Sequence, residues 1–115
     1  MKTLKDYKKE LEENINNPTN LGEIGDQIAA DYAYYSEEII PIKLKKPEIW
    51  IKIKTYDNNN RLREKYLSDA LTDKIWQSTE MGQKEIELKY TMQGLEKMAS
   101  AIKSHLIALN REYNH

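Results

Sequence analysis

The chain has 115 residues, a formal net charge of −1, and no cysteine, valine or phenylalanine. This length predicts one domain with a modest core, and the absence of cysteine excludes disulfides, thiolate metal sites and a cysteine nucleophile. Because sheets depend on β-branched and aromatic residues, a chain without valine is a poor candidate for an all-β fold.

Residues 1–40 are predicted to form an acidic helical hairpin, with 4 basic and 9 acidic side chains. The first helix carries apolar side chains at helical spacing, namely Leu4, Tyr7, Leu11 and Ile15. Asn17-Pro18 interrupts the pattern. A second helix is expected to begin near Asn20, which resembles a capping box with Glu23. It should end before Pro41, because the residue preceding a proline disfavours the α conformation.

Residues 41–61 are predicted to be a basic connector, since residues 41–65 hold 8 basic and 3 acidic side chains. Within it, residues 48–56 have two readings. Ile49, Ile51 and Ile53 alternate with polar residues as in a short strand, whereas Pro47 and Glu48 would open a short helix. The helix is favoured because the chain offers no strand partner.

Residues 62–115 are predicted to form a long helical arm that begins at Leu62. Trp76 and Gly82 suggest an elbow between two packed helices, because glycine in a helix interior permits a close crossing or a kink. From Leu88 to Leu109 the apolar residues step by four and three, which indicates a seam over several heptads. The predicted packing and oligomer seam comprises Trp76, Gly82, Leu88, Met92, Leu95, Ala99, Ile102, Leu106 and Leu109.

The predicted fold class is therefore all-α: one helical domain over residues 1–115, an elongated hairpin or bundle of about four to five helices. A helix from Thr79 to Glu112 would be about 50 Å long, longer than the hairpin can cover, so a homo-oligomer is expected. The first residues are charged and no stretch has the length and apolarity of a membrane span. We therefore expect a cytoplasmic protein without membrane contacts.

Catalytic, cofactor and metal sites are not expected. The only histidines are His105 and His115, too few for a zinc site without cysteine. The segment from Asp57 lacks the glycine and glutamate of a calcium loop, because Leu62 and Ser68 occupy those positions. No nucleophile elbow or glycine-rich phosphate loop is present. The sequence predicts no enzyme.

One charged stretch has the composition of a nucleic-acid site. Single-stranded sites combine cations along the backbone with aromatic side chains that stack on bases. The residues that fit are Lys43, Lys45, Lys46, Trp50, Lys52, Lys54, Tyr56, Arg61 and Arg63. The alternative is that lysine stems flank a buried Ile/Trp face and keep their ammonium groups in water.

From Asp69 onward the chain resembles small helical proteins of phages and prophages. The resemblance lies in the spacing of ten residues over roughly the last 45: Trp76, Thr79, Gly82, Lys89, Leu95, Met98, Ser100, Ala101, Ile102 and Leu106. Genes for such proteins often sit among early genes for recombination and replication. The resemblance implies an accessory role in DNA metabolism, in the cytoplasm of a bacterial host.

Two functions are therefore expected from different classes. The first is a non-enzymatic accessory protein of DNA recombination or replication that contacts single-stranded DNA through Lys43–Arg63. The second is a protein–protein module, such as a phage anti-defence protein or an inhibitor of a host factor, that acts through a helical surface.

Overall fold

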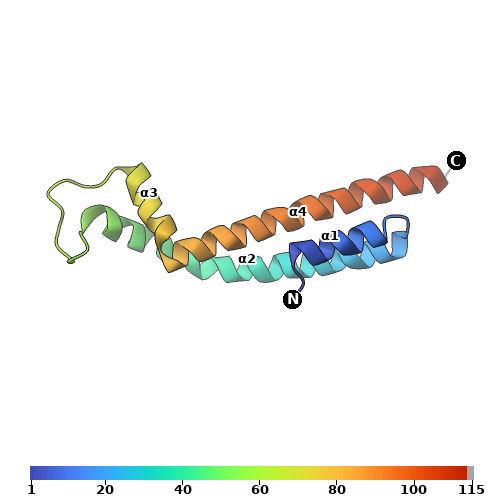
Figure 1. Ribbon diagram of the computed structural model, residues 1–115, viewed down its shortest axis with the longest axis horizontal. Helices are drawn as coiled ribbons and strands as arrows, with labels where there is room; N and C mark the ends of the chain where they lie inside the picture. The colour runs from blue at the N-terminus through green and yellow to red at the C-terminus, as the bar shows by residue number, and fades with distance from the viewer. Residues whose placement is uncertain (114–115) are drawn as a thin grey trace. The chain divides into compact units, whose positions relative to one another are not determined.

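The structure is a computed structural model that describes residues 1–113, and His115 lies outside the described residues. It contains four α-helices (Figure 1), α1 (Leu4–Glu13), α2 (Pro18–Thr55), α3 (Asp69–Ser78) and α4 (Glu80–Tyr113). In this part of the chain the one β feature is an isolated antiparallel bridge between Tyr56 and Leu62. The prediction of an all-α fold with a long C-terminal helix is confirmed.

The chain forms two compact units, and α2 and α4 each contribute to both. Unit 1 contains Met1–Ser36 and α4 from Tyr90 onward, and unit 2 contains Glu37–Lys89. The boundaries between the units therefore fall inside α2 and α4.

Unit 1 packs α1 against α2 and α4 (Figure 1). Thr3 caps α1 through a capping box: its hydroxyl accepts from the Asp6 amide at 3.2 Å, and its own amide donates to the Asp6 carboxylate at 2.9 Å. The Tyr7 side chain is fully buried, and its hydroxyl donates to Asp31 of α2. The buried core comprises Tyr7, Leu21, Ile24, Ile28, Leu95, Ile102 and Leu109.

Helix α2 begins earlier than predicted. Its first residue is Pro18, and the side chain of Asn17 accepts a hydrogen bond from the Asn20 amide at 3.1 Å. The predicted capping box at Asn20 is therefore wrong. Asparagine is a strong N-cap, and proline suits the first helical position because its missing N–H has no intrahelical partner there.

Helix α2 also continues beyond Pro41, where it was predicted to end. Pro41 and Pro47 both lie inside the helix. Each proline removes one backbone hydrogen bond, to the carbonyl four residues earlier. Those carbonyls belong to Glu37 and Lys43. Both prolines and both of these residues are exposed, so that water can solvate the freed carbonyl oxygens. Residues 48–55 are consequently helical, as favoured, and are not a strand.

Residues 62–67 are not helical, so the prediction that the helical arm begins at Leu62 is wrong. Helix α3 begins only at Asp69, where the Ser68 hydroxyl accepts a hydrogen bond from the Leu71 amide at 3.2 Å. The amides of Arg63 and Leu67 instead donate to carbonyls at the end of α2. Hydrogen bonds to α2 thus replace those that a helix from Leu62 would form.

In unit 2, α3 contacts α2 through the Trp50–Asp73 and Lys54–Asp69 pairs, and it contacts α4 through Trp76 and Glu85. Trp76 is 1% exposed. Thr79 has an extended backbone that separates α3 from α4, and its hydroxyl accepts from the Gly82 amide at 3.0 Å. A Cβ atom on Gly82 would lie 1.9 Å from the carbonyl oxygen of Trp76. The elbow therefore requires glycine at position 82.

The predicted seam on α4 is filled mainly within the chain. Five of its members on this helix are buried: Gly82 and Leu88 in unit 2, and Leu95, Ile102 and Leu109 in unit 1. Met92 and Leu106 are half-buried, whereas Ala99 is exposed. The seam thus leaves little apolar surface for the homo-oligomer expected from its length.

Candidate functional site

The most organised exposed feature of unit 2 is the segment that joins α2 to α3, residues 56–67, here called the 56–67 loop. The last four carbonyls of an α-helix have no intrahelical partner. At the end of α2 the Lys52 carbonyl accepts a hydrogen bond from the Tyr56 amide at 2.8 Å. The Thr55 carbonyl accepts one from the Arg63 amide, also at 2.8 Å. The Ile53 carbonyl accepts a hydrogen bond from Arg63 Nε at 3.3 Å, and the Lys54 carbonyl accepts one from the Leu67 amide at 3.2 Å. The loop therefore caps the whole end of α2.

A tight turn closes the tip of the loop. The Asp57 side chain accepts hydrogen bonds from the amides of Asn59 and Arg61, at 2.9 and 3.0 Å. Asn60 has a φ of 62°, a left-handed conformation that asparagine tolerates better than most residues. The segment that superficially resembled a calcium loop is thus an aspartate-capped turn.

The loop displays apolar and aromatic side chains to solvent. Tyr56 is 43% exposed, Leu62 62% and Tyr66 53%. Arg61 is also exposed. Tyr56 and Leu62 form the antiparallel bridge, so that the backbone of the loop fixes the positions of both side chains. Ordered loops on rigid scaffolds are where binding residues concentrate, so this loop is the candidate functional site.

Two members of the predicted nucleic-acid stretch instead fasten α2 to α3. Trp50 donates from Nε1 to the Asp73 carboxylate at 2.7 Å. Lys54 forms an ion pair with Asp69, and its ammonium nitrogen lies 5.0 Å from the centre of the Trp50 ring. The indole is therefore already covered by a cation, and Lys54 is already neutralised by a carboxylate.

A third member of the stretch, on α2, contacts the core of unit 2. Lys46 donates to the Glu85 carboxylate at 3.0 Å, and the Trp76 indole donates to the same carboxylate at 3.2 Å. Lys89 lies 3.7 Å from that carboxylate. Burial raises the pKa of the Glu85 carboxyl, but these hydrogen bonds and positive charges lower it by more, so that its pKa lies below the ordinary value.

The nine predicted nucleic-acid residues therefore separate into two groups. Four have structural roles: Lys46, Trp50, Lys54 and Arg63. The other five are exposed: Lys43, Lys45, Lys52, Tyr56 and Arg61. Four of the nine residues are therefore engaged within the fold, and five remain exposed.

Sequence reasoning missed Leu62, Tyr66 and Glu85. The two apolar residues are four apart, which resembles the spacing of a buried helical face. Their exposure depends on the hydrogen bonds from the loop to α2, which leave no signal in the apolar pattern. Glu85 is 5% exposed and has no signal in the local sequence, because its partners Lys46 and Trp76 lie on other helices.

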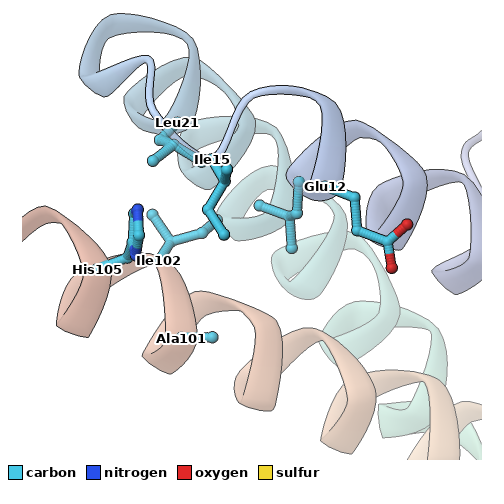
Figure 2. Close-up of a pocket in the computed structure, with 7 residues that line it drawn as sticks. Glu12, Ile15, Leu21, Ala101, Ile102 and His105 are labelled. Atoms are coloured by element: carbon cyan, nitrogen blue, oxygen red, sulfur yellow. The ribbon is translucent and has the colours of Figure 1, made fainter.

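Unit 1 contains a small apolar pocket (Figure 2) with a volume of about 200 Å³. Figure 2 shows Ile15, Leu21, Ile102 and His105 around it, with the Glu12 carboxylate pointing away from His105. Nε2 of His105 is shielded from solvent and has no hydrogen-bond partner among residues 1–113. The pocket thus lacks the converging polar groups typical of a specific ligand site, and it is a weaker candidate than the 56–67 loop.

The described part of the chain includes neither a candidate metal cluster nor a helix that could span a membrane. Residues 1–113 contain no cluster of three histidine, cysteine, aspartate or glutamate side chains placed to hold a metal ion. None of the helices in the same range has the length and apolarity needed to span a membrane. Comparisons with protein-family models, curated proteins and solved structures gave no match to this chain.

Proposed function

We propose that this chain is a non-enzymatic protein-binding module that docks its partner on the 56–67 loop. One observation carries the proposal: Tyr56, Leu62 and Tyr66 are exposed on a loop whose backbone is hydrogen-bonded to the end of α2. Binding through such a loop costs little conformational entropy, because its conformation is formed before the partner arrives.

The side chains of the loop are those that dominate protein interfaces. Tyrosine and arginine are enriched among the residues that contribute most to binding. Tyrosine offers a large contact area with only two side-chain torsions to fix. Tyr56, Tyr66 and Arg61 supply these types around the apolar Leu62, an arrangement that favours a partner with a shallow apolar pocket and a polar rim.

The same loop is less suited to nucleic acid. Its three cations, Arg61, Arg63 and Lys65, are largely balanced by the Asp57 and Glu64 carboxylates, and Leu62 has neither a charge nor a stacking surface. Sites for single strands combine cations with stacking aromatics. On α2, next to the loop, the cation Lys54 and the aromatic Trp50 are already engaged with Asp69 and Asp73. These engagements favour the protein-binding function over the DNA-accessory function.

The resemblance to phage early proteins supports a bacterial host protein as the partner. On that basis the chain would act as an inhibitor of a host defence or replication factor. It would do so by covering a surface of that factor, without any chemical step.

The test compares three immobilised baits in a nuclease-treated lysate of a bacterial host. They are the unchanged chain, the Tyr56→Ala/Tyr66→Ala variant and a Tyr34→Ala/Tyr90→Ala control that removes two exposed tyrosines of unit 1. The unchanged chain and the control should retain the same protein in stoichiometric amount, and the loop variant should lose it. Equal retention by all three baits, or retention only before nuclease treatment, would contradict the proposal.

A further inference from the structure

Helix α2 has a second exposed apolar feature within unit 2, on the face opposite the core. Ile40 is 51% exposed, Leu44 76% and Ile51 52%, and Pro47 between them is also exposed. These positions are separated by four, three and four residues, the spacing of a coiled-coil seam. We name Ile40, Leu44, Pro47 and Ile51 the α2 stripe.

The α2 stripe is separate from the core of unit 2. The neighbouring residues Ile39 and Ile42 face the core and are 3% and 5% exposed. Large aliphatic side chains in water at regular seam spacing are a common mark of an association surface. The remaining question is which helix would cover the stripe.

The charges along the two edges of the stripe indicate which helix could cover it. Lys43 lies on one edge, and Glu48, five residues later, lies on the other. In a parallel pair of identical helices, these are the positions that face each other across the seam. Lys43 of each copy would then meet the partner's Glu48. The nearest cation to Glu48 within its own chain is Lys52 at 4.0 Å, and both side chains are mostly exposed, so that Glu48 remains available.

An antiparallel pair would not bring opposite charges together. It would place each edge against the same edge of the partner. Lys43 would face Trp50 or a second Lys43, and Glu48 would face Pro41, Thr55 or a second Glu48. Only the parallel orientation therefore places both Lys43 and Glu48 next to a residue of opposite charge.

We propose that the α2 stripe binds the α2 stripe of a second copy of this chain, as a parallel pair with two symmetric Lys43–Glu48 contacts. The dimer would display two 56–67 loops and so could bind a repetitive partner with higher avidity. The proposal does not depend on what the loops bind.

The first test uses the absence of native cysteine. In the parallel register Leu44 packs against the partner's Leu44, so that Leu44→Cys should form an intermolecular disulfide under mild oxidation. Lys74→Cys, at an exposed position on α3, is the matched control for random collisions. A disulfide-linked dimer from Leu44→Cys well in excess of the control supports the proposal, and equal yields from the two variants would overturn it.

The second test reverses the charges and reads the dimer dissociation constant by analytical ultracentrifugation. Lys43→Glu alone and Glu48→Lys alone should each weaken the dimer at least about threefold, because each replaces two attractions with two repulsions. The Lys43→Glu/Glu48→Lys double variant should restore the original constant. A monomeric unchanged chain, or a dimer insensitive to these reversals, would overturn the proposal.

Discussion

The side chain of Arg63 ties the 56–67 loop to the last turn of α2, because its Nε donates to the carbonyl oxygen of Ile53 at 3.3 Å. Its amide also donates to the Thr55 carbonyl at 2.8 Å. A residue that the composition suggested as a phosphate contact is therefore a helix cap. The loop consequently holds Tyr56 and Leu62 in place without help from a partner.

Removing this tether should loosen the loop without unfolding unit 2. Arg63→Ala should lower the free energy of unfolding by about 1 kcal/mol, the usual contribution of one hydrogen bond. It should also speed amide exchange at positions 63 and 67, whose N–H groups cap α2. Hydrogen–deuterium exchange measures both sites. Arg61→Ala, an exposed cation of the same loop, is the matched control, and the same acceleration in that variant would contradict the assigned role of Arg63.

Glu85 should make unit 2 sensitive to acid. Because the pKa of its carboxyl is lower in the folded chain than its ordinary value of 4.5, its contribution to stability is present above about pH 4.5. This contribution is lost as the pH falls through the lowered folded pKa. Glu85→Gln should lower the free energy of unfolding at pH 7 by about 1–3 kcal/mol and remove this part of the acid dependence.

Denaturant unfolding at pH 7 and pH 4 would measure both effects of Glu85→Gln. Glu12→Gln alters an exposed carboxylate of α1 and is the control. If Glu85→Gln and Glu12→Gln gave the same pH dependence, the buried network would not stabilise the fold as inferred here.

Two glycines in helices should respond to alanine in opposite directions. At Gly82 the new Cβ would lie 1.9 Å from the Trp76 carbonyl oxygen, so that the elbow must shift. We expect Gly82→Ala to cost about 3 kcal/mol or more. Nothing lies within 4 Å of a Cβ on Gly22, and Gly22→Ala in α2 should stabilise by about 0.5–1 kcal/mol. Thermal unfolding of the two variants would measure this contrast, and a Gly82→Ala variant as stable as the original would exclude the tight crossing.

A short single-stranded oligonucleotide should leave the tryptophan fluorescence unchanged, at low as well as moderate salt. The Trp50 indole is held by Asp73 and covered by Lys54, and Trp76 is buried. The indole of Trp50 therefore has a cation over one face, and that of Trp76 is out of reach of a base. Quenching would contradict this expectation. If the logarithm of its binding constant fell linearly with the logarithm of the salt concentration, it would indicate phosphate contacts and would favour the DNA-accessory function.

The sequence predicted the helices well where apolar spacing is long and regular, as in α4. It failed at Pro41, because a proline disfavours a helix without always ending it, and a helix can continue through a proline where water solvates the freed carbonyl. The Glu37 carbonyl that Pro41 frees lies on an exposed face of α2. It also failed at Leu62, because three hydrogen bonds from distant loop residues fix the end of α2, and no local pattern encodes them.

The candidate site was predicted only in outline. The stretch 43–63 was recognised, but its residues were grouped by closeness along the chain. In α2 the helical turn instead directs Lys46 toward Glu85 and leaves Lys43 exposed. The partners of Lys46 and Trp50 lie 39 and 23 residues away, so that their structural roles depend on tertiary packing and not on local sequence.

The most direct test of the protein-binding function is photo-crosslinking from the centre of the 56–67 loop in bacterial cells. A photoreactive amino acid replaces Leu62 in one variant and Lys74, exposed on α3, in a matched control. Protein docking on the loop predicts one discrete protein adduct from position 62, absent from position 74 and lost when Tyr56 and Tyr66 are both changed to alanine. No adduct from position 62, or the same adduct from both positions, would contradict docking on this loop.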